Sequence, residues 1–144
     1  MLLGGALSVV IVILLYVLTS ALNRDIRVAE DELAGLQMLK PMNRMVQFMQ
    51  QHRGLSSGVL NGNEAMKDKR AAKEKELNDE VMAADRALAP GLRTQAAWQS
   101  ITQDWDAIRQ GGLAMAPPEN LKRHSAMIGK VLDFMINVAD ESKL

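Results

Sequence analysis

Hydrophobic residues follow two patterns along the chain: one uninterrupted run at the start, then a helical period. Residues 1–22 carry no charged side chain. As a helix rising ~1.5 Å per residue they would span roughly 33 Å, about the apolar thickness of a bilayer. A secretory signal peptide is the alternative, but it would have a basic start and a shorter apolar run. We therefore expect residues 1–22 to be an uncleaved transmembrane anchor that contacts the lipid bilayer.

The first segment after the anchor runs from about residue 23 to 60 and has apolar positions at steps of three and four. This spacing predicts an amphipathic helix. Pro41 lies inside it and is expected to bend the helix or weaken one turn. No helix-breaking residue separates it from the anchor, so the two can be continuous. The predicted stripe consists of Ile26, Ala29, Leu33, Leu36, Leu39, Met42, Val46 and Met49.

Three further amphipathic segments follow, over about residues 64–88, 94–110 and 119–142. The breaks between them are typical turn sequences: Asn61-Gly62-Asn63, Pro90-Gly91, and Gly111-Gly112 followed by Pro117-Pro118. The third segment places Trp98, Ile101, Trp105 and Ile108 on one face. The fourth has a regular 3-4-3-4 seam: Leu121, His124, Ile128, Val131, Met135, Val138 and Ser142.

These patterns predict an all-α fold, because no stretch alternates with a period of two. Four amphipathic helices joined by short links favour an up-down-up-down four-helix bundle. The expected organisation is a transmembrane anchor over residues 1–22 and a four-helix-bundle domain over residues 23–144.

Charge and composition remove several function classes. Lys+Arg and Asp+Glu both number 17, so the chain lacks the basic excess that nucleic-acid binding requires. There is no cysteine, which excludes disulfides and thiolate chemistry. Two histidines form no His-rich metal cluster. We expect no cofactor and no metal.

One pentapeptide, Gly54-Leu55-Ser56-Ser57-Gly58, matches the G-x-S-x-G pattern of serine hydrolases. That pattern works only at a strand-to-helix turn of a parallel sheet, and no βαβ alternation is present here. Gly54 and Gly58 instead share one helix face and are expected to let a neighbouring helix approach. His52 lacks the flanking residues of a phospho-accepting histidine. The charged run over residues 67–76 is expected to be a solvated helix face. We therefore expect no enzymatic activity.

A polar layer is predicted near the tip of the bundle that lies farthest from the anchor. Folding the chain up and down places its members at similar depths, roughly 8–11 Å below the tip at ~1.5 Å per residue. Inward-facing cations and an imidazole would bind a small anion. The alternatives are neutralisation by Asp104, Asp106 or Glu64, and long side chains that turn outward. The candidate ligand-binding residues are Arg53, Arg70, Lys73, Trp105 and His124.

The sequence also resembles helical sensor ectodomains of bacterial transmembrane receptors, including the nitrate- and nitrite-sensing (NIT-type) domains. The similarity rests on residues 36–41, on Gln50 to Gly58 with its Arg53-Gly54-Leu55-Ser56 motif, on the Trp98 to Trp105 spacing, and on the last helix. It covers about residues 25–144. The chain departs from the family at His52, where the usual motif has Glu, and ends where such receptors continue. We expect either a receptor fragment or a short orphan protein.

The resemblance implies a homodimeric sensor module of chemotaxis receptors, histidine kinases or diguanylate cyclases in the bacterial inner membrane. It places the bundle in the periplasm and implies signalling by helix displacement. Arg24, Arg27 and Lys40 follow the apolar run, and by the positive-inside rule they would place the bundle in the cytoplasm. A start codon assigned too late would explain this conflict. The rival hypothesis is a helical scaffold presented at a membrane without ligand sensing.

Overall fold

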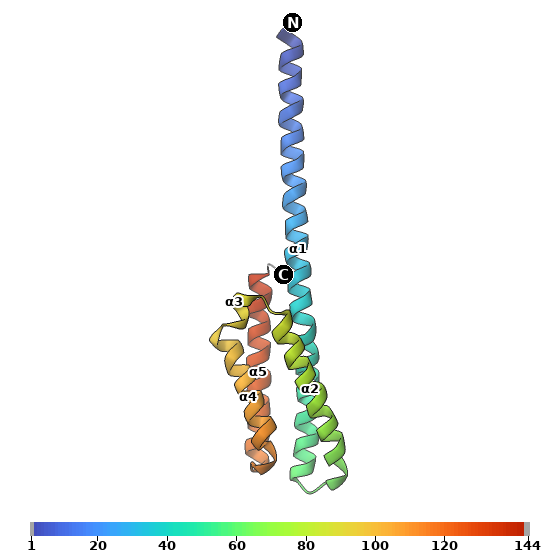
Figure 1. Ribbon diagram of the computed structural model, residues 1–144, viewed down its shortest axis with the longest axis vertical. Coiled ribbons are helices and arrows are strands. Elements are labelled where there is room, and N and C mark those ends of the chain that lie inside the picture. The colour runs from blue at the N-terminus through green and yellow to red at the C-terminus, as the bar shows by residue number, and fades with distance from the viewer. Residues whose placement is uncertain (1, 143–144) are drawn as a thin grey trace.

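The computed structural model describes residues 2–142, with side chains from residue 9 onward, and is helical throughout. The longest helix, α1, runs from Leu2 to Leu60 without a break. Its first half extends far beyond the rest of the molecule (Figure 1). The prediction of an all-α chain is confirmed for these residues, which contain no strand.

The remaining helices follow the predicted order with small differences at their ends. A 3₁₀ turn, η1 (Glu64–Met66), precedes α2 (Lys67–Ala87). A short helix that the sequence did not predict, α3 (Pro90–Arg93), lies in the following link. Then come α4 (Ala96–Gly111), a second 3₁₀ turn η2 (Gly112–Ala114), and α5 (Pro117–Glu141). Proline at the first turn suits α3 and α5, because that position has no intrahelical N–H bond to lose.

The apolar start of α1 lies outside the packed part of the molecule. The side chains of residues 9–18 are all about half exposed or more, and α1 is the one described helix long and apolar enough to cross a membrane. A signal sequence has the same properties, so the uncleaved anchor stays a prediction. Helix α1 also continues through Pro41, which removes one backbone hydrogen bond without ending the helix.

The second half of α1 packs against α2 and α5, and α4 packs against α5. In Figure 1 the chain runs down α1, up α2, down α4 and up α5. The buried core is rich in methionine and carries both tryptophans, as the sequence predicted. Its most completely buried apolar members are Met42, Met45, Met49, Leu77, Ala84, Trp98, Ile101, Met127, Val131 and Val138.

The two indole N–H groups of α4 form hydrogen bonds to α2. Trp98 Nε1 donates to Asp85 Oδ1 at 2.8 Å, and Trp105 Nε1 donates to Asn78 Oδ1 at 3.2 Å. An open groove of about 300 Å³ lies between these helices beside Trp105.

Part of the predicted stripe on α1 does not join this core. Ile26, Leu33 and Leu36 are more than half exposed. The reason is length, because α5 has 25 residues whereas the segment of α1 after the apolar run has about 38. At ~1.5 Å per residue the partner helix ends roughly 20 Å short of the start of that segment. Leu121, placed on the seam of α5, is also exposed.

Candidate functional site

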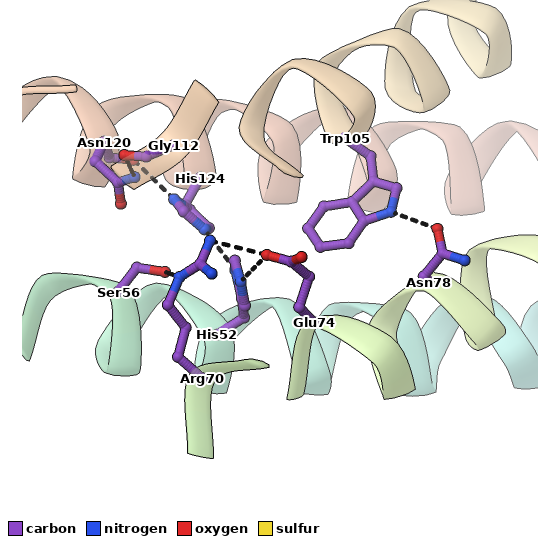
Figure 2. Close-up of polar contacts among 9 residues, drawn as sticks. All are labelled: His52, Ser56, Arg70, Glu74, Asn78, Trp105, Gly112, Asn120 and His124. Atoms are coloured by element: carbon purple, nitrogen blue, oxygen red, sulfur yellow. Dashed lines mark hydrogen bonds and ion pairs between the residues drawn. The ribbon is translucent and has the colours of Figure 1, made fainter. Parts of the chain in front are cut away.

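A buried polar layer crosses the core between α1, α2 and α5. Helix α1 contributes His52 and Ser56, both fully buried. Helix α2 contributes Arg70 and the partly buried Glu74, and α5 contributes His124. Figure 2 shows these side chains converging from the three helices. The layer is therefore built from charged and imidazole groups at positions where a helical core usually holds apolar ones.

Helical spacing explains why His52 points inward. Met42, Met45 and Met49 are fully buried on α1. His52 and Ser56 continue the same row, with steps of three, four, three and four along the helix. Residues at this spacing share one helix face. The two polar side chains thus extend the methionine stripe toward the C-terminal end of α1.

Arg70 is held by two partners inside the layer. Its Nε donates to Ser56 Oγ at 3.0 Å, and one terminal nitrogen lies 2.9 Å from Glu74 Oε2. A buried guanidinium is costly unless it is paired and hydrogen-bonded. Glu74 lies one turn further along α2 and supplies the opposite charge, so the layer carries its own counter-ion.

The two histidines contact each other directly. His52 Nδ1 lies 2.9 Å from His124 Nε2, and the ring centroids are 5.1 Å apart. His124 Nδ1 lies 2.8 Å from the backbone carbonyl of Asn120, one turn earlier on α5. The edge of the Trp105 ring meets the His52 ring at 5.4 Å and 78°. The imidazole pair thus links α1 to α5, with α4 covering one side.

Burial holds both imidazoles in the neutral form at neutral pH. Burial, followed by the positive charge of Arg70 and the neighbouring His124, lowers the pKa of His52 to about 3. Burial is also the largest cause that lowers the pKa of His124. The hydrogen bond to the Asn120 carbonyl opposes this shift, and the charges of Arg70 and Arg53 add to it.

The structure brings together three of the five predicted site residues: Arg70, Trp105 and His124. The other two lie outside the layer. Arg53 is half-buried and donates to Ser125 Oγ at 3.0 Å, while Lys73 pairs with Glu76 and lies 4.2 Å from the centre of the Phe48 ring. For Arg53 the reason is angular, because it directly follows the buried His52 and is turned by about 100° from it.

Sequence reasoning missed three residues of the layer: His52, Ser56 and Glu74. The predicted stripe on α1 passed through Val46 and Met49 to Arg53, one position beyond His52. Glu74 was assigned to a solvated run, yet it pairs with Arg70 in the core. The row of Met42, Met45 and Met49 could have predicted the burial of His52, because a further step of three along the helix leads to this residue.

The neutralising partners expected from the sequence pair elsewhere. Asp104 pairs with Lys130 at 2.6 Å. Asp106 pairs with Arg109 at 3.0 Å, and Glu64 pairs with Lys67. These acidic side chains lie at the surface, whereas Glu74 lies one helical turn from Arg70 and reaches it directly.

The G-x-S-x-G pentapeptide lies inside α1, where its backbone is continuous helix. The strand-to-helix turn that a serine nucleophile needs is therefore not formed at these residues. A side chain at Gly54 would meet open space, so the expected close helix approach at this residue is wrong. At Gly58 a Cβ would meet the Met66 side chain of η1, so one close contact exists there.

No protein-family model matches the sequence, and neither a curated protein nor a solved structure matches the chain. The resemblance to NIT-type sensor domains therefore stays a prediction. The geometry of the buried layer and its position on α1 are the observations on which a function can be argued.

Proposed function

We propose that this chain is a membrane-anchored sensor module of a bacterial signal-transduction receptor, with its packed helices outside the cytoplasm. The observation that carries the proposal is the continuity of α1. One unbroken helix joins the apolar run near the N-terminus to His52 in the buried layer. A displacement of α1 at the layer would therefore be carried along the helix to the membrane.

We further propose that α2, α4, α5 and the second half of α1 act as one up-down-up-down four-helix bundle. The core shared by these helices supports this arrangement. Shifts of about 1–2 Å between packed helices are a common way of transmitting a signal. The contacts that would change are those between α1 and α5, where His52 meets His124 and Arg53 meets Ser125.

A small anion is one ligand class for this module. Arg70 is the only one of the three predicted site cations that lies in the buried layer, and Glu74 already occupies one side of its guanidinium. An anion at this point would have to displace that carboxylate or join it at the mouth of the layer. Displacement of Glu74 would break an ion pair within α2, while the hydrogen bond from Arg70 to Ser56 would still link α2 to α1.

A second copy of the chain is the partner that we propose for the exposed part of α1. The exposed positions Leu22, Ile26, Ala29, Leu33 and Leu36 have the 4-3-4-3 spacing of a coiled-coil seam. Two anchored chains would present these seams in parallel. Asp25 and Glu30 would face each other across such a pair and weaken it, so the packed domains would have to contribute to a stable dimer.

The rival function is a structural bundle that presents a surface at the membrane. The pairing of Arg70 with Glu74 and Ser56 favours it, because a scaffold needs no open site. Spin labels on the exposed residues Lys40 of α1 and Asp140 of α5 separate the two functions in the full chain, reconstituted in lipid nanodiscs. The native chain has no cysteine, so labelling is specific.

For a sensor, the distance between these labels shifts by about 1–2 Å when a stimulus from a panel of nitrate, small carboxylates and protons is applied. Arg70→Met should abolish the shift, and the matched surface change Arg109→Met should leave it intact. A distance unchanged by every stimulus would support the scaffold. A single label on Ala34 reports the dimer, because only paired chains give a dipolar signal between copies.

A further inference from the structure

The hydrogen bonds across the layer have a fixed direction. The backbone carbonyl of Asn120 can only accept, so His124 Nδ1 carries the hydrogen of that 2.8 Å bond. In a neutral His124 the other nitrogen, Nε2, is then an acceptor. His52 Nδ1, 2.9 Å away, must therefore donate to it. Both rings thus carry their single hydrogen on Nδ1.

The series of hydrogen bonds stops at His52, whose contact with Glu74 contains no hydrogen. His52 Nε2 is left with a lone pair that faces Glu74 Oε2 at 3.5 Å. Both atoms are buried; His52 Nε2 has no hydrogen-bond partner among the residues that the structure describes, and Glu74 Oε2 has only its ion-pair contact with Arg70 at 2.9 Å. Two acceptors facing each other repel, and a hydrogen between them would satisfy both.

Groups from all the surrounding helices face His52, and only some of them are charged. Glu74 of α2 attracts a proton to Nε2. Arg70 of α2, which lies 2.9 Å from the same carboxylate oxygen, repels it. From α5 and α4, His124 and Trp105 contribute an uncharged acceptor and a ring edge. The low pKa of His52 means that the position between Nε2 and the carboxylate is empty at neutral pH and fills in acid.

We propose that the layer is a binding site for one proton, which enters between His52 Nε2 and Glu74 Oε2. The proton comes from solvent and forms one new N–H bond on His52, and no existing hydrogen bond breaks. His52 Nε2 then donates to Glu74, His52 Nδ1 still donates to His124, and His124 still donates to Asn120. The charge of the layer rises by one, and an unbroken chain of bonds joins α2, α1 and α5.

The bound proton draws α1 toward α2. The His52–Glu74 contact of 3.5 Å is longer than a charge-assisted hydrogen bond, which measures ~2.7–2.9 Å. Closing that gap moves His52 and the helix that carries it by a fraction of an ångström. Only the statement that this movement is a signal rests on the proposed sensor function, since the proton site itself exists in a scaffold as well.

Nitrogen-15 NMR of the two imidazoles tests the site in the full chain, isotope-labelled on histidine and held in detergent micelles. At pH 7 both rings should show hydrogen on Nδ1 and a bare Nε2. As the pH falls from 7 through about 3, His52 should gain a hydrogen on Nε2 while the tryptophan signals still report a folded core. An Nε2–H form of either ring at pH 7, or unfolding before any uptake, would overturn the proposal.

Glu74→Gln provides the variant test, with Glu76→Gln on the surface of the same helix as its matched control. Loss of the carboxylate should raise the proton concentration needed for uptake at His52 at least tenfold, and the control should titrate like the native chain. Equal titration of all three proteins would overturn the site. Proton uptake without any change in the Lys40–Asp140 label distance would support the proton site and contradict the proposed sensor function.

Discussion

The placement of His52 shows how one residue changes the chemistry of a helical core. It occupies a position that methionine fills at three preceding points of the same row, and it is fully buried there. A buried imidazole stays neutral unless a nearby carboxylate compensates its positive charge. Glu74 lies close to His52 but is not hydrogen-bonded to it. The residue therefore costs little at neutral pH and becomes costly in acid.

The first prediction is a loss of stability in acid. Because the folded-state pKa of His52 is about 3, below the unfolded value of 6.5, the unfolded chain binds its proton first. His52 thus contributes stability that is complete above pH 6.5 and is lost as the pH falls toward 3. At ~1.4 kcal/mol per pH unit, the loss between pH 6.5 and 4.5 is roughly 3 kcal/mol, and His124 adds to it in the same direction.

Urea unfolding of the full chain at pH 7, 5.5 and 4.5 measures this loss. His52→Met continues the methionine row and should flatten the dependence by the His52 share. A free energy of unfolding that stays constant across this range in the native chain would contradict the burial of neutral imidazoles.

Helix α1 combines three environments in one element: an apolar run, an exposed seam and a packed half. Helical backbone bonds are local, so the helix continues through all three regardless of what surrounds it. The far end of the packed half contains Gly54 and Gly58, four residues apart, whose surroundings differ. Gly54 is exposed with open space around it, whereas Gly58 lies against Met66.

The second prediction compares alanine at these two glycines. Gly54→Ala should raise the free energy of unfolding by about 0.4–1 kcal/mol, because alanine restricts the unfolded chain and fits the helix. At Gly58 a Cβ would lie 2.2 Å from Met66 Sδ, so the methionine must move and the gain should shrink or vanish. Gly58→Leu should cost about 1–3 kcal/mol. Chemical unfolding monitored by circular dichroism measures all three, and equal gains from both alanines would contradict the Met66 contact.

The whole molecule is asymmetric along its length, with an uncovered helix at one end and the packed helices at the other (Figure 1). The side chains of residues 9–18 contact nothing else in the chain strongly enough to bury them. A continuous surface of exposed apolar side chains is stable only in lipid or against another protein. The shape therefore agrees with attachment at the N-terminal end.

The third prediction concerns this attachment and its direction. The full chain should stay in the membrane fraction after a high-salt wash, because apolar burial is insensitive to salt. Protease added outside spheroplasts should digest the packed helices if they are periplasmic. Release of a shortened chain would identify a cleaved signal peptide. Protection from the protease would support the orientation indicated by Arg24, Arg27 and Lys40 and reject the periplasmic placement.

The sequence by itself determined the helical class, the order of the four long helices and the apolar character of the first 22 residues. These properties depend on spacing within a few residues, because a helix makes its hydrogen bonds locally. The burial of Trp98 and Trp105 followed from the same spacing, and the structure confirms it. So did the inward positions of Arg70 and His124.

Only the tertiary structure decided which neighbours the polar side chains meet. The sequence allowed two adjacent rows on α1, one ending at His52 and one at Arg53, and a rotation of about 100° separates them. Packing against α5 selects the row that carries His52. The same packing brings Glu74 within 3.5 Å of His52 and leaves Ile26, Leu33 and Leu36 uncovered, because contacts between helices depend on their lengths and rotations. The spacing of residues within one helix does not determine how that helix is rotated against its neighbours or how far they extend along it.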